Sequence, residues 1–344
     1  MYSNLVSILI PVFNKENYLL DSMNSILNQN YTNLEILIYD DCSTDNSLQV
    51  LNSINDSRIK IYKGQINKGV RYARDFLLKL AKGDYISFFD ADDICNKNKY
   101  TFSLNYLNTN TKIDLLASKV DYINENGSKI LKLFTFESFK PKSIKSNLFF
   151  SNTITTSTVV FRRSLIPFIN FLEYNYVIGE DYFIWIKLSE KFNLVNLTKK
   201  LTTYRITNNG MMANTVNKYE EAINYIHNYQ FEKIGLNNRY DLIAIHNKFM
   251  FTNNITLIYL KKSLILYKIL LFNSINTYDH ISFLEQIRIN WLRKLIVYSK
   301  NNPIKSIYIY FKYFKYHNYR SILNIYKLII FSMYYLFKKN NVFN

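Results

Sequence analysis

Residues 6–89 alternate short, nearly continuous apolar runs with stretches of helical periodicity. Strands that are apolar along most of their length are typical of a parallel sheet with helices on both faces. Strands are predicted at Val6–Val12, Leu34–Tyr39, Ile59–Tyr62 and Tyr85–Phe89. Helical patterns follow the first three of these runs, the third at residues 70–81. The sequence therefore predicts an α/β fold with a mainly parallel central sheet.

The pattern beyond residue 110 is less regular. Strands are expected near Leu115–Ile123 and Thr156–Phe161, and loops at residues 125–128 and around Pro141. After about residue 215 glycine nearly disappears, and long stretches rich in Ile, Leu, Tyr and Lys predict several helices. A chain of 344 residues is long enough for two units. We predict a catalytic domain at residues 1–214 and a helical region at residues 215–344.

The net charge of +17 is unevenly distributed: residues 1–214 carry +5 and residues 215–344 carry +12. A basic tail suits an anionic membrane or nucleic acid. Here Tyr, Phe, Ile and Leu alternate with Lys at helical spacing, which favours the membrane surface. No apolar run reaches the roughly 18 to 20 residues that span a bilayer, since even Ile322–Phe337 contains polar interruptions. We expect peripheral contact with an anionic membrane and no nucleic-acid partner.

The two cysteines, Cys42 and Cys95, have the spacing of neither a disulfide framework nor a zinc site. The first twenty residues lack the basic segment and long apolar core of a secretory leader. Both observations favour a reducing compartment. The expected location is cytoplasmic, with peripheral association at the inner face of the cell membrane.

An acidic cluster, Asp90-Ala91-Asp92-Asp93, directly follows the fourth predicted strand. Carboxylates at a strand end can share a divalent cation with a diphosphate, because Mn²⁺ and Mg²⁺ prefer oxygen ligands. Asp92 and Asp90 are then the predicted metal ligands, and the ion would stabilise a diphosphate leaving group. A solvated acidic turn explains the same cluster equally well when it is taken alone.

Four other residues suggest a nucleotide site, each with a structural alternative. Asp41, after the second strand, can accept a hydrogen bond from a uracil ring N–H or can cap a helix. Phe13 can stack on a base or belong to the core. Arg71 and Arg74 share one face near a helix start and can contact a diphosphate or lie on the surface.

Two acids, Glu180 and Asp181, follow Gly179 at a predicted helix start. One carboxylate there can remove a proton from an attacking hydroxyl, which is the work of a general base. On the residues alone, acids that complement the helix dipole are the more favoured explanation.

Two features that the sequence lacks argue against particular classes of enzyme. All four histidines (His227, His246, His280 and His317) lie in the tail, which weakens a Ser-His-Asp hydrolase. No G-x-G occurs, which excludes the dinucleotide fingerprint and the P-loop. Phosphates must then be held by a metal and by arginine.

The motifs, in this order and spacing, resemble the family-2 glycosyltransferases with a GT-A fold. The resemblance covers about residues 5–210. It is carried by Val6–Asn14, Glu35–Asp45, Asn67–Arg74, Gly83–Ile86, Asp90–Asp93, Gly179–Asp181 and Tyr204-Arg205.

The resemblance implies a role for each matching position. The nucleotide base would be surrounded by Pro11, Phe13 and Asp41, with Arg74 near base or diphosphate. Asp90 and Asp92 would face the ribose, the diphosphate and the metal. Asp93 would lie near the donor sugar or the metal. Asp181 would be the base and Glu180 would orient the acceptor.

The reaction implied is transfer of a sugar with inversion, from a nucleotide-sugar donor that is UDP-linked by resemblance, to a hydroxyl of a glycan or lipid-linked glycan. An excess of Asn, Lys, Ile, Tyr and Phe suggests an AT-rich coding bias. Together with the resemblance, this bias fits a bacterium that builds surface polysaccharide.

Two positions depart from the family pattern. Cys42 stands where a small residue, usually Gly, is common, and Thr207 stands where His is common. The second change removes a metal or diphosphate contact that Thr207, Asn208 or Asn209 would have to replace. A glycoside hydrolase with paired acids and a non-catalytic binding protein that retains the fold are the alternatives.

Overall fold

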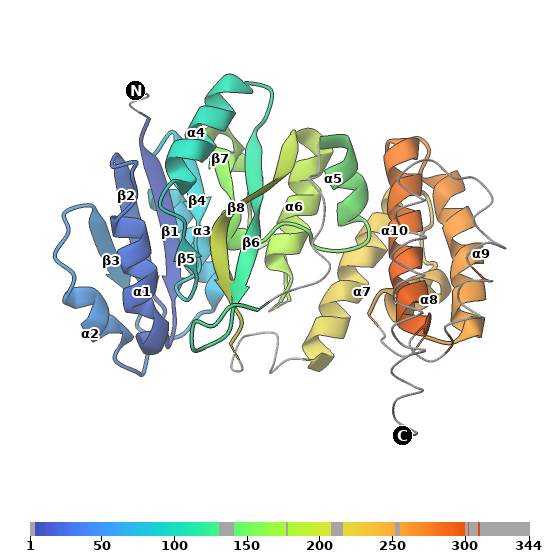
Figure 1. The fold of residues 1–344 in the computed structure, drawn as a ribbon, viewed down its shortest axis with the longest axis horizontal. Helices are drawn as coiled ribbons and strands as arrows, with labels where there is room; N and C mark the ends of the chain where they lie inside the picture. The colour runs from blue at the N-terminus through green and yellow to red at the C-terminus, as the bar shows by residue number, and fades with distance from the viewer. Residues whose placement is uncertain are drawn as a thin grey trace, which may run out of the picture. The chain divides into compact units, whose positions relative to one another are not determined.

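Strand β1 (Val6–Val12) lies inside an eight-stranded sheet in the computed structural model of the chain (Figure 1). The structure describes residues 4–130, 141–176, 178–207, 216–251, 255–299, 302 and 309. The strand order is β3-β2-β1-β4-β7-β6-β8-β5.

The first half of the sheet is the parallel part that the sequence predicts. Its strands are β1, β2 (Leu34–Asp40), β3 (Ile59–Lys63) and β4 (Tyr85–Phe88). β1 pairs in parallel with β2 and β4, and β2 pairs in parallel with β3. The connecting helices are α1 (Glu16–Leu27), α2 (Ser47–Asn52) and α3 (Val70–Leu80).

The second half reverses direction at β7 (Val160–Arg162), which is antiparallel to both of its neighbours. The remaining strands are β5 (Ile94–Cys95), β6 (Leu115–Ile123) and β8 (Leu194–Arg205). β6 and β8 pair in parallel. The helices are α4 (Lys99–Thr109), α5 (Pro141–Leu148), η2 (Arg163–Phe168) and α6 (Glu180–Lys191).

Two local expectations in this half are wrong. Residues Thr156–Thr158 form a 3-10 turn, η1, rather than the start of a strand. The N–H groups of Thr158 and Val159 donate to the carbonyls of Thr155 and Thr156 within the turn, so these backbone groups are not available to a β ladder. Pro141 begins helix α5 instead of a loop, because proline's fixed φ and missing N–H suit the first helical position.

The core on one face of the parallel half follows from strand and helix periodicity. Val6, Ile8 and Ile10 of β1 are fully buried in one cluster with Leu19, Met23 and Ile26 of α1. Alternate strand residues share a face, and the helix residues recur at intervals of three and four. Each such burial stabilises the fold by about 1.5 to 3 kcal/mol. This packing fixes the strand ends that carry the site.

The chain divides into two compact units, Met1–Ala222 and Ile223–Asn344. Helices α7 (Val216–Lys233), α8 (Tyr240–Phe251), α9 (Leu257–Asn273) and α10 (His280–Ser299) follow the sheet, as the tail sequence predicts. Within the residues that are described, no helix combines the length and apolarity needed to cross a bilayer. The boundary predicted between residues 214 and 215, and the run at residues 322–337, lie outside the described residues.

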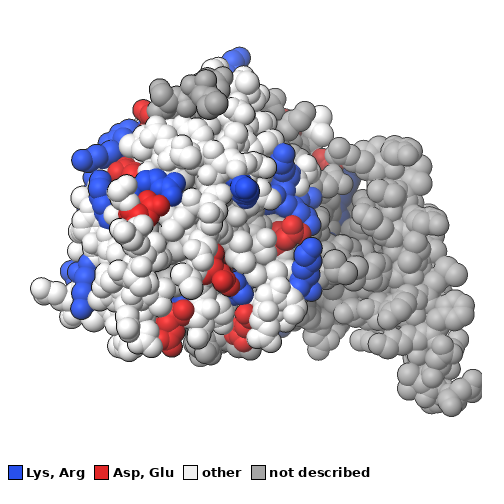
Figure 2. Space-filling model, turned by 60° about the vertical axis from the view of Figure 1, so that its left-hand side comes forward, with Lys and Arg blue, Asp and Glu red and all other residues white. Residues whose placement is uncertain are grey.

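The surface charge of the first unit is mixed. Figure 2 shows Lys and Arg side chains interspersed with Asp and Glu side chains over the face that it displays. This distribution agrees with the small net charge of residues 1–214.

Candidate active site

The parallel strands β1, β2 and β4 end at one edge of the sheet, and the loops that follow them carry the predicted site. β1 separates β2 from β4, which places their ends about 10 Å apart. The loop after β1 is fastened to the loop after β2. The Asn14 side chain accepts the Thr44 N–H at 2.8 Å, and the Glu16 carboxylate accepts the Asn46 N–H at 2.9 Å.

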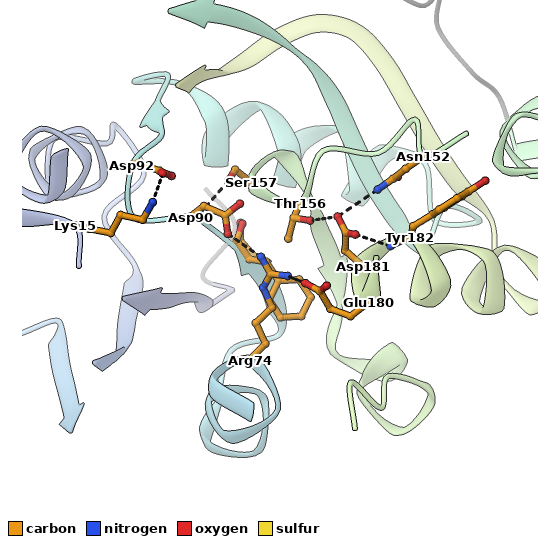
Figure 3. A network of polar contacts seen from close by, with 12 residues as sticks. Lys15, Arg74, Asp90, Asp92, Asn152, Thr156, Ser157, Glu180, Asp181 and Tyr182 are labelled. Carbon is orange, nitrogen blue, oxygen red and sulfur yellow. Dashed lines mark hydrogen bonds and ion pairs between the residues drawn. The ribbon is translucent and has the colours of Figure 1, made fainter. Parts of the chain in front are cut away.

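A buried guanidinium joins distant acidic segments at this edge (Figure 3). Arg74, on α3, donates to Asp90 at 2.8 Å and to Glu180 at 2.6 Å. Burial opposes the charged guanidinium, but the carboxylates of Asp90 and Glu180 together raise the pKa of Arg74. Two segments that lie far apart in sequence are thereby brought to one centre.

The acidic loop after β4 is held by a lysine and a serine. The Lys15 ammonium forms an ion pair with Asp92. The Asp90 N–H donates to the Ser157 hydroxyl at 3.0 Å. The Ser157 carbonyl in turn accepts the ammonium of the buried Lys99 at 2.6 Å. The loop therefore has a fixed backbone, while Asp90 and Asp92 keep partly exposed side chains.

Asp93 is the buried member of the cluster. Its carboxylate accepts the Arg205 N–H at 2.9 Å, and its other oxygen has no hydrogen-bond partner among the described residues. Burial, with the charges of Asp90 and Asp92, raises the pKa of Asp93. The Arg205 side chain also donates to the Asp92 carbonyl at 3.0 Å. The end of β8 thus clamps the acidic loop.

Asp181 lies in the first turn of α6, after Gly179. Gly179 has a φ of +85°, a conformation that glycine adopts without strain. The Asp181 carboxylate accepts the Thr156 hydroxyl at 2.7 Å and the Asn152 amide at 3.3 Å, and it binds the Tyr182 N–H at 2.7 Å. Both oxygens are oriented by neighbours (Figure 3).

The charges of the site shift the pKa values of Glu180 and Tyr204. Burial raises the pKa of Glu180 to about 7, opposed by Arg74 and reinforced by Asp181. Burial also raises the pKa of Tyr204, and the charges of Asp93, Asp90, Asp92 and Asp181 add to this shift. The carboxylates after β4 and at the start of α6 therefore lie close enough to the Tyr204 phenol to contribute to the rise of its pKa.

Asp41 contacts the backbone of the loop before α3. Its two carboxylate oxygens accept the N–H groups of Lys68 at 2.8 Å and Gly69 at 2.6 Å. The next residue, Cys42, has a φ of +61°, in the left-handed region that favours glycine. This conformation gives a physical reason for the glycine that is common there in the resembling family.

The other predicted nucleotide residues lie around the end of β1 and the start of α3. Pro11 is half-buried, and Phe13 is 42% exposed, so Phe13 is accessible to a ligand. Arg71 donates instead to the Tyr174 carbonyl. Of the two arginines, Arg74 alone contacts the acidic centre in the described part of the chain.

The described residues alone do not complete a metal site. Among the described residues, no three His, Cys, Asp or Glu side chains are grouped to hold a metal ion. Asp90 and Asp92 are paired with Arg74 and Lys15 instead. Thr207 is half-buried, and Asn208 and Asn209 lie outside the described residues.

The sequence did not predict several residues that contact the acidic side chains of the site or hold its loops. They are Lys15, Lys99, Asn152, Thr156 and Ser157, while Arg205 was noted in a motif without a role. The polar run Thr155-Thr156-Ser157-Thr158 before an apolar strand was the one available signal.

Comparisons with known proteins identify the family of the chain. The profile described as Glycosyl transferase family 2 matches residues 7–167. The Escherichia coli UDP-Glc:alpha-D-GlcNAc-diphosphoundecaprenol beta-1,3-glucosyltransferase WfaP is 33% identical over 221 residues, which are 64% of this chain and 83% of WfaP. The E. coli enzyme WfgD, of the same description, is 32% identical over 61% of this chain and 80% of its own length.

Solved structures show the same fold. S. aureus TarS 1-349 superposes with a TM-score of 0.55 at 19% identity, over 96% of this chain and 91% of that one. Its complex with UDP-GlcNAc superposes with a TM-score of 0.54 at 21% identity, over 88% and 83% of the two chains. The fold is of the GT-A glycosyltransferase type. The chain belongs to glycosyl transferase family 2.

Proposed function

We propose that this enzyme transfers a sugar, with inversion, from a UDP-sugar to a hydroxyl of a lipid-linked glycan. The observation that carries the proposal is the Arg74 bridge, which joins Asp90 after β4 to Glu180 beside Asp181. Two E. coli relatives are named for transfer of glucose from UDP to a GlcNAc-diphosphoundecaprenol, and TarS is solved with UDP and with UDP-GlcNAc. These names support the donor and acceptor classes.

Asp181 is the proposed general base. The acceptor oxygen forms a bond to the anomeric carbon as its proton passes to the Asp181 carboxylate. The bond from the anomeric carbon to the diphosphate oxygen breaks, and UDP leaves with the electron pair. A single displacement of this kind inverts the anomeric carbon and needs one base. Thr156 and Asn152 hold the carboxylate for this step, and Glu180 orients the acceptor.

A divalent cation, Mn²⁺ or Mg²⁺, fits the carboxylates after β4. Asp90 and Asp92 are partly exposed, and Asp93 has a buried oxygen without a partner among the described residues. Hard oxygen donors of this kind suit such ions. When bound, the ion would neutralise charge on the departing diphosphate. Arg74 supplies a fixed positive charge at the same centre.

The nucleotide is proposed to lie over the ends of β1 and β2. The exposed Phe13 ring stacks on the base beside Pro11. Asp41 is buried and binds two backbone N–H groups, so it holds the base-binding loop in place, and a remaining lone pair would accept a ring N–H. Arg71 is a peripheral member of this site, since it binds the Tyr174 carbonyl.

We propose separate roles for the two regions of the chain. Residues 1–214 form the catalytic domain, and residues 215–344 associate peripherally with the inner face of an anionic membrane. The tail's charge of +12 and the lipid-linked acceptors named for the relatives support this arrangement. The product would enter bacterial surface polysaccharide.

A panel of nucleotide sugars with Mn²⁺ tests the proposal. Release of nucleoside diphosphate should depend on both a UDP-sugar and an undecaprenyl-diphosphate-linked GlcNAc acceptor. A glycoside hydrolase would instead cleave glycosides without any nucleotide. A binding protein that retains the fold would bind UDP-sugar in calorimetry but release no UDP. Either result would replace the proposed reaction.

A further inference from the structure

Helix α9 is apolar on two opposite sides. One side packs inside the second unit and is formed by Leu260, Leu266 and Leu270. The other side carries Ile258, Ile265 and Phe272, which are 66, 64 and 82% exposed. These three residues are spaced by seven, so they form one stripe along the helix. A stripe of exposed apolar side chains of this kind marks an interaction surface.

Three lysines line the same exposed side of α9. Lys261, Lys262 and Lys268 are all exposed, and each lies three or four residues from a member of the apolar stripe. Residues 242–278 contain four lysines and neither Asp nor Glu. The stripe is therefore flanked by positive charges, and its own segment offers no carboxylate to neutralise them.

We infer that this side of α9 docks on an anionic lipid bilayer. The docking face consists of Ile258, Lys261, Lys262, Ile265, Lys268 and Phe272. The apolar side chains would enter the boundary between headgroups and acyl chains, and the lysines would meet lipid phosphates. α9 has 17 residues and does not meet the criteria for a membrane span, so it would lie along the surface.

Charge complementarity favours lipid over a second copy of the chain. In a symmetric dimer through this face, the lysines of one copy would oppose those of the other without acids between them. An anionic bilayer supplies both an apolar layer and phosphates to the six residues. The inference deepens the proposed function, because it names the surface by which the enzyme would reach a lipid-linked acceptor.

The test places a fluorescent reporter on the docking face of the full-length protein. Both tryptophans, Trp185 and Trp291, are fully buried, so Phe272→Trp adds the one exposed indole. Vesicles of phosphatidylglycerol and phosphatidylethanolamine should shift its emission to the blue, and brominated acyl chains should quench it. Leu20→Trp, at a 51% exposed site in the first unit, is the matched control and should not respond.

Binding is then measured by vesicle flotation. The triple variants Ile258→Ser/Ile265→Ser/Phe272→Ser and Lys261→Gln/Lys262→Gln/Lys268→Gln should each lower the partition coefficient at least about tenfold. Because all six side chains are exposed, circular dichroism should show an unchanged fold. The lysine variant should lose its preference for phosphatidylglycerol over phosphatidylcholine vesicles.

Three outcomes would overturn the inference. The first is equal partitioning of wild-type and variants into vesicles. The second is a Phe272→Trp emission spectrum that does not change when vesicles are added. The third is loss of dimers or of RNA binding in the variants without any change in flotation. Turnover with a detergent-dispersed acceptor does not require membrane docking. It therefore distinguishes an error in the docking inference from an error in the proposed reaction. The α9 variants should keep that turnover, whereas an enzyme with another function would show none in any variant.

Discussion

The Arg74 guanidinium donates to the Glu180 carboxylate at 2.6 Å across 106 residues of sequence. The same guanidinium donates to Asp90 at 2.8 Å. Arg74 and Glu180 are both about 5% exposed. The contact therefore links α3, the loop after β4 and the start of α6 into a single buried centre, and it places Asp181 beside the acidic loop.

Arg74→Met should destabilise the first unit by about 3 to 5 kcal/mol, because it leaves buried carboxylates without their positive partner. Denaturant unfolding of the full chain measures this loss. Lys79→Met is the control, since Lys79 pairs with Asp75 on the same helix but is mostly exposed. Similar unfolding midpoints for the two variants would contradict the central role of Arg74.

Glu180→Gln should alter the pH dependence of turnover. Burial raises the pKa of Glu180 to about 7. Its charged form, which holds Arg74, is gained as the pH rises through that value. Wild-type kcat/KM should therefore increase between about pH 6 and 8, and the variant should lack this limb. A limb that persists unchanged in Glu180→Gln would assign the titration to another group.

Lys15→Met should strengthen binding of Mn²⁺ in the absence of nucleotide. The Lys15 ammonium pairs with Asp92, and its removal leaves that carboxylate free for a divalent cation. A gain of about fivefold is expected for one screened charge interaction. Electron paramagnetic resonance of free Mn²⁺ measures it. Lys60→Met, which removes a partner of Glu35 instead, should have no effect, and weaker binding by Lys15→Met would refute the prediction.

A buried histidine pair makes the second unit sensitive to acid. The His227 and His246 rings lie 4.6 Å apart. Burial lowers the pKa of His227 to about 4 and lowers that of His246 as well. The unfolded state, with pKa values of about 6.5, therefore takes up protons first. The stability contributed by neutral His227, about 3 kcal/mol, is present above that pH and lost as the pH falls toward 4.

Chemical denaturation at a series of pH values measures this loss. His246→Leu should flatten the slope of stability against pH between about pH 6.5 and 4. His280→Gln, at an exposed position, should leave the slope unchanged. Identical slopes in wild-type and His246→Leu would show that the pair does not control acid stability.

The parallel half of the fold could be predicted because its strands are mostly apolar and a helical pattern follows each of the first three. The acidic end of β4 was visible for the same reason, as Asp90 directly follows an apolar run. The reversal at β7 could not be predicted, since a three-residue strand carries little periodicity. The 3-10 turn before it resembled a strand because two of its three residues are β-branched threonines.

The partners within the site could not be predicted because they depend on contacts between distant segments. The sequence left Arg74 with a surface alternative, yet its burial follows only when α6 delivers Glu180. Lys15 had no predicted role, because its ion pair with Asp92 depends on β1 and β4 being adjacent in the sheet. Asp181 is oriented by Thr156 and Asn152, whose roles depend on the irregular segment before β7.

The most direct test of the account compares Asp181→Asn with two other variants in the transfer of sugar from UDP-glucose to a lipid-linked acceptor. Asp181→Asn should lower kcat by about 10² to 10⁴-fold while UDP-glucose binding is kept. Thr156→Val, which removes the 2.7 Å hydrogen bond to Asp181, should lower kcat less. Asp121→Asn, at an exposed ion pair with Lys200, should match wild-type. Wild-type turnover in Asp181→Asn would contradict the proposed base and the site built around it.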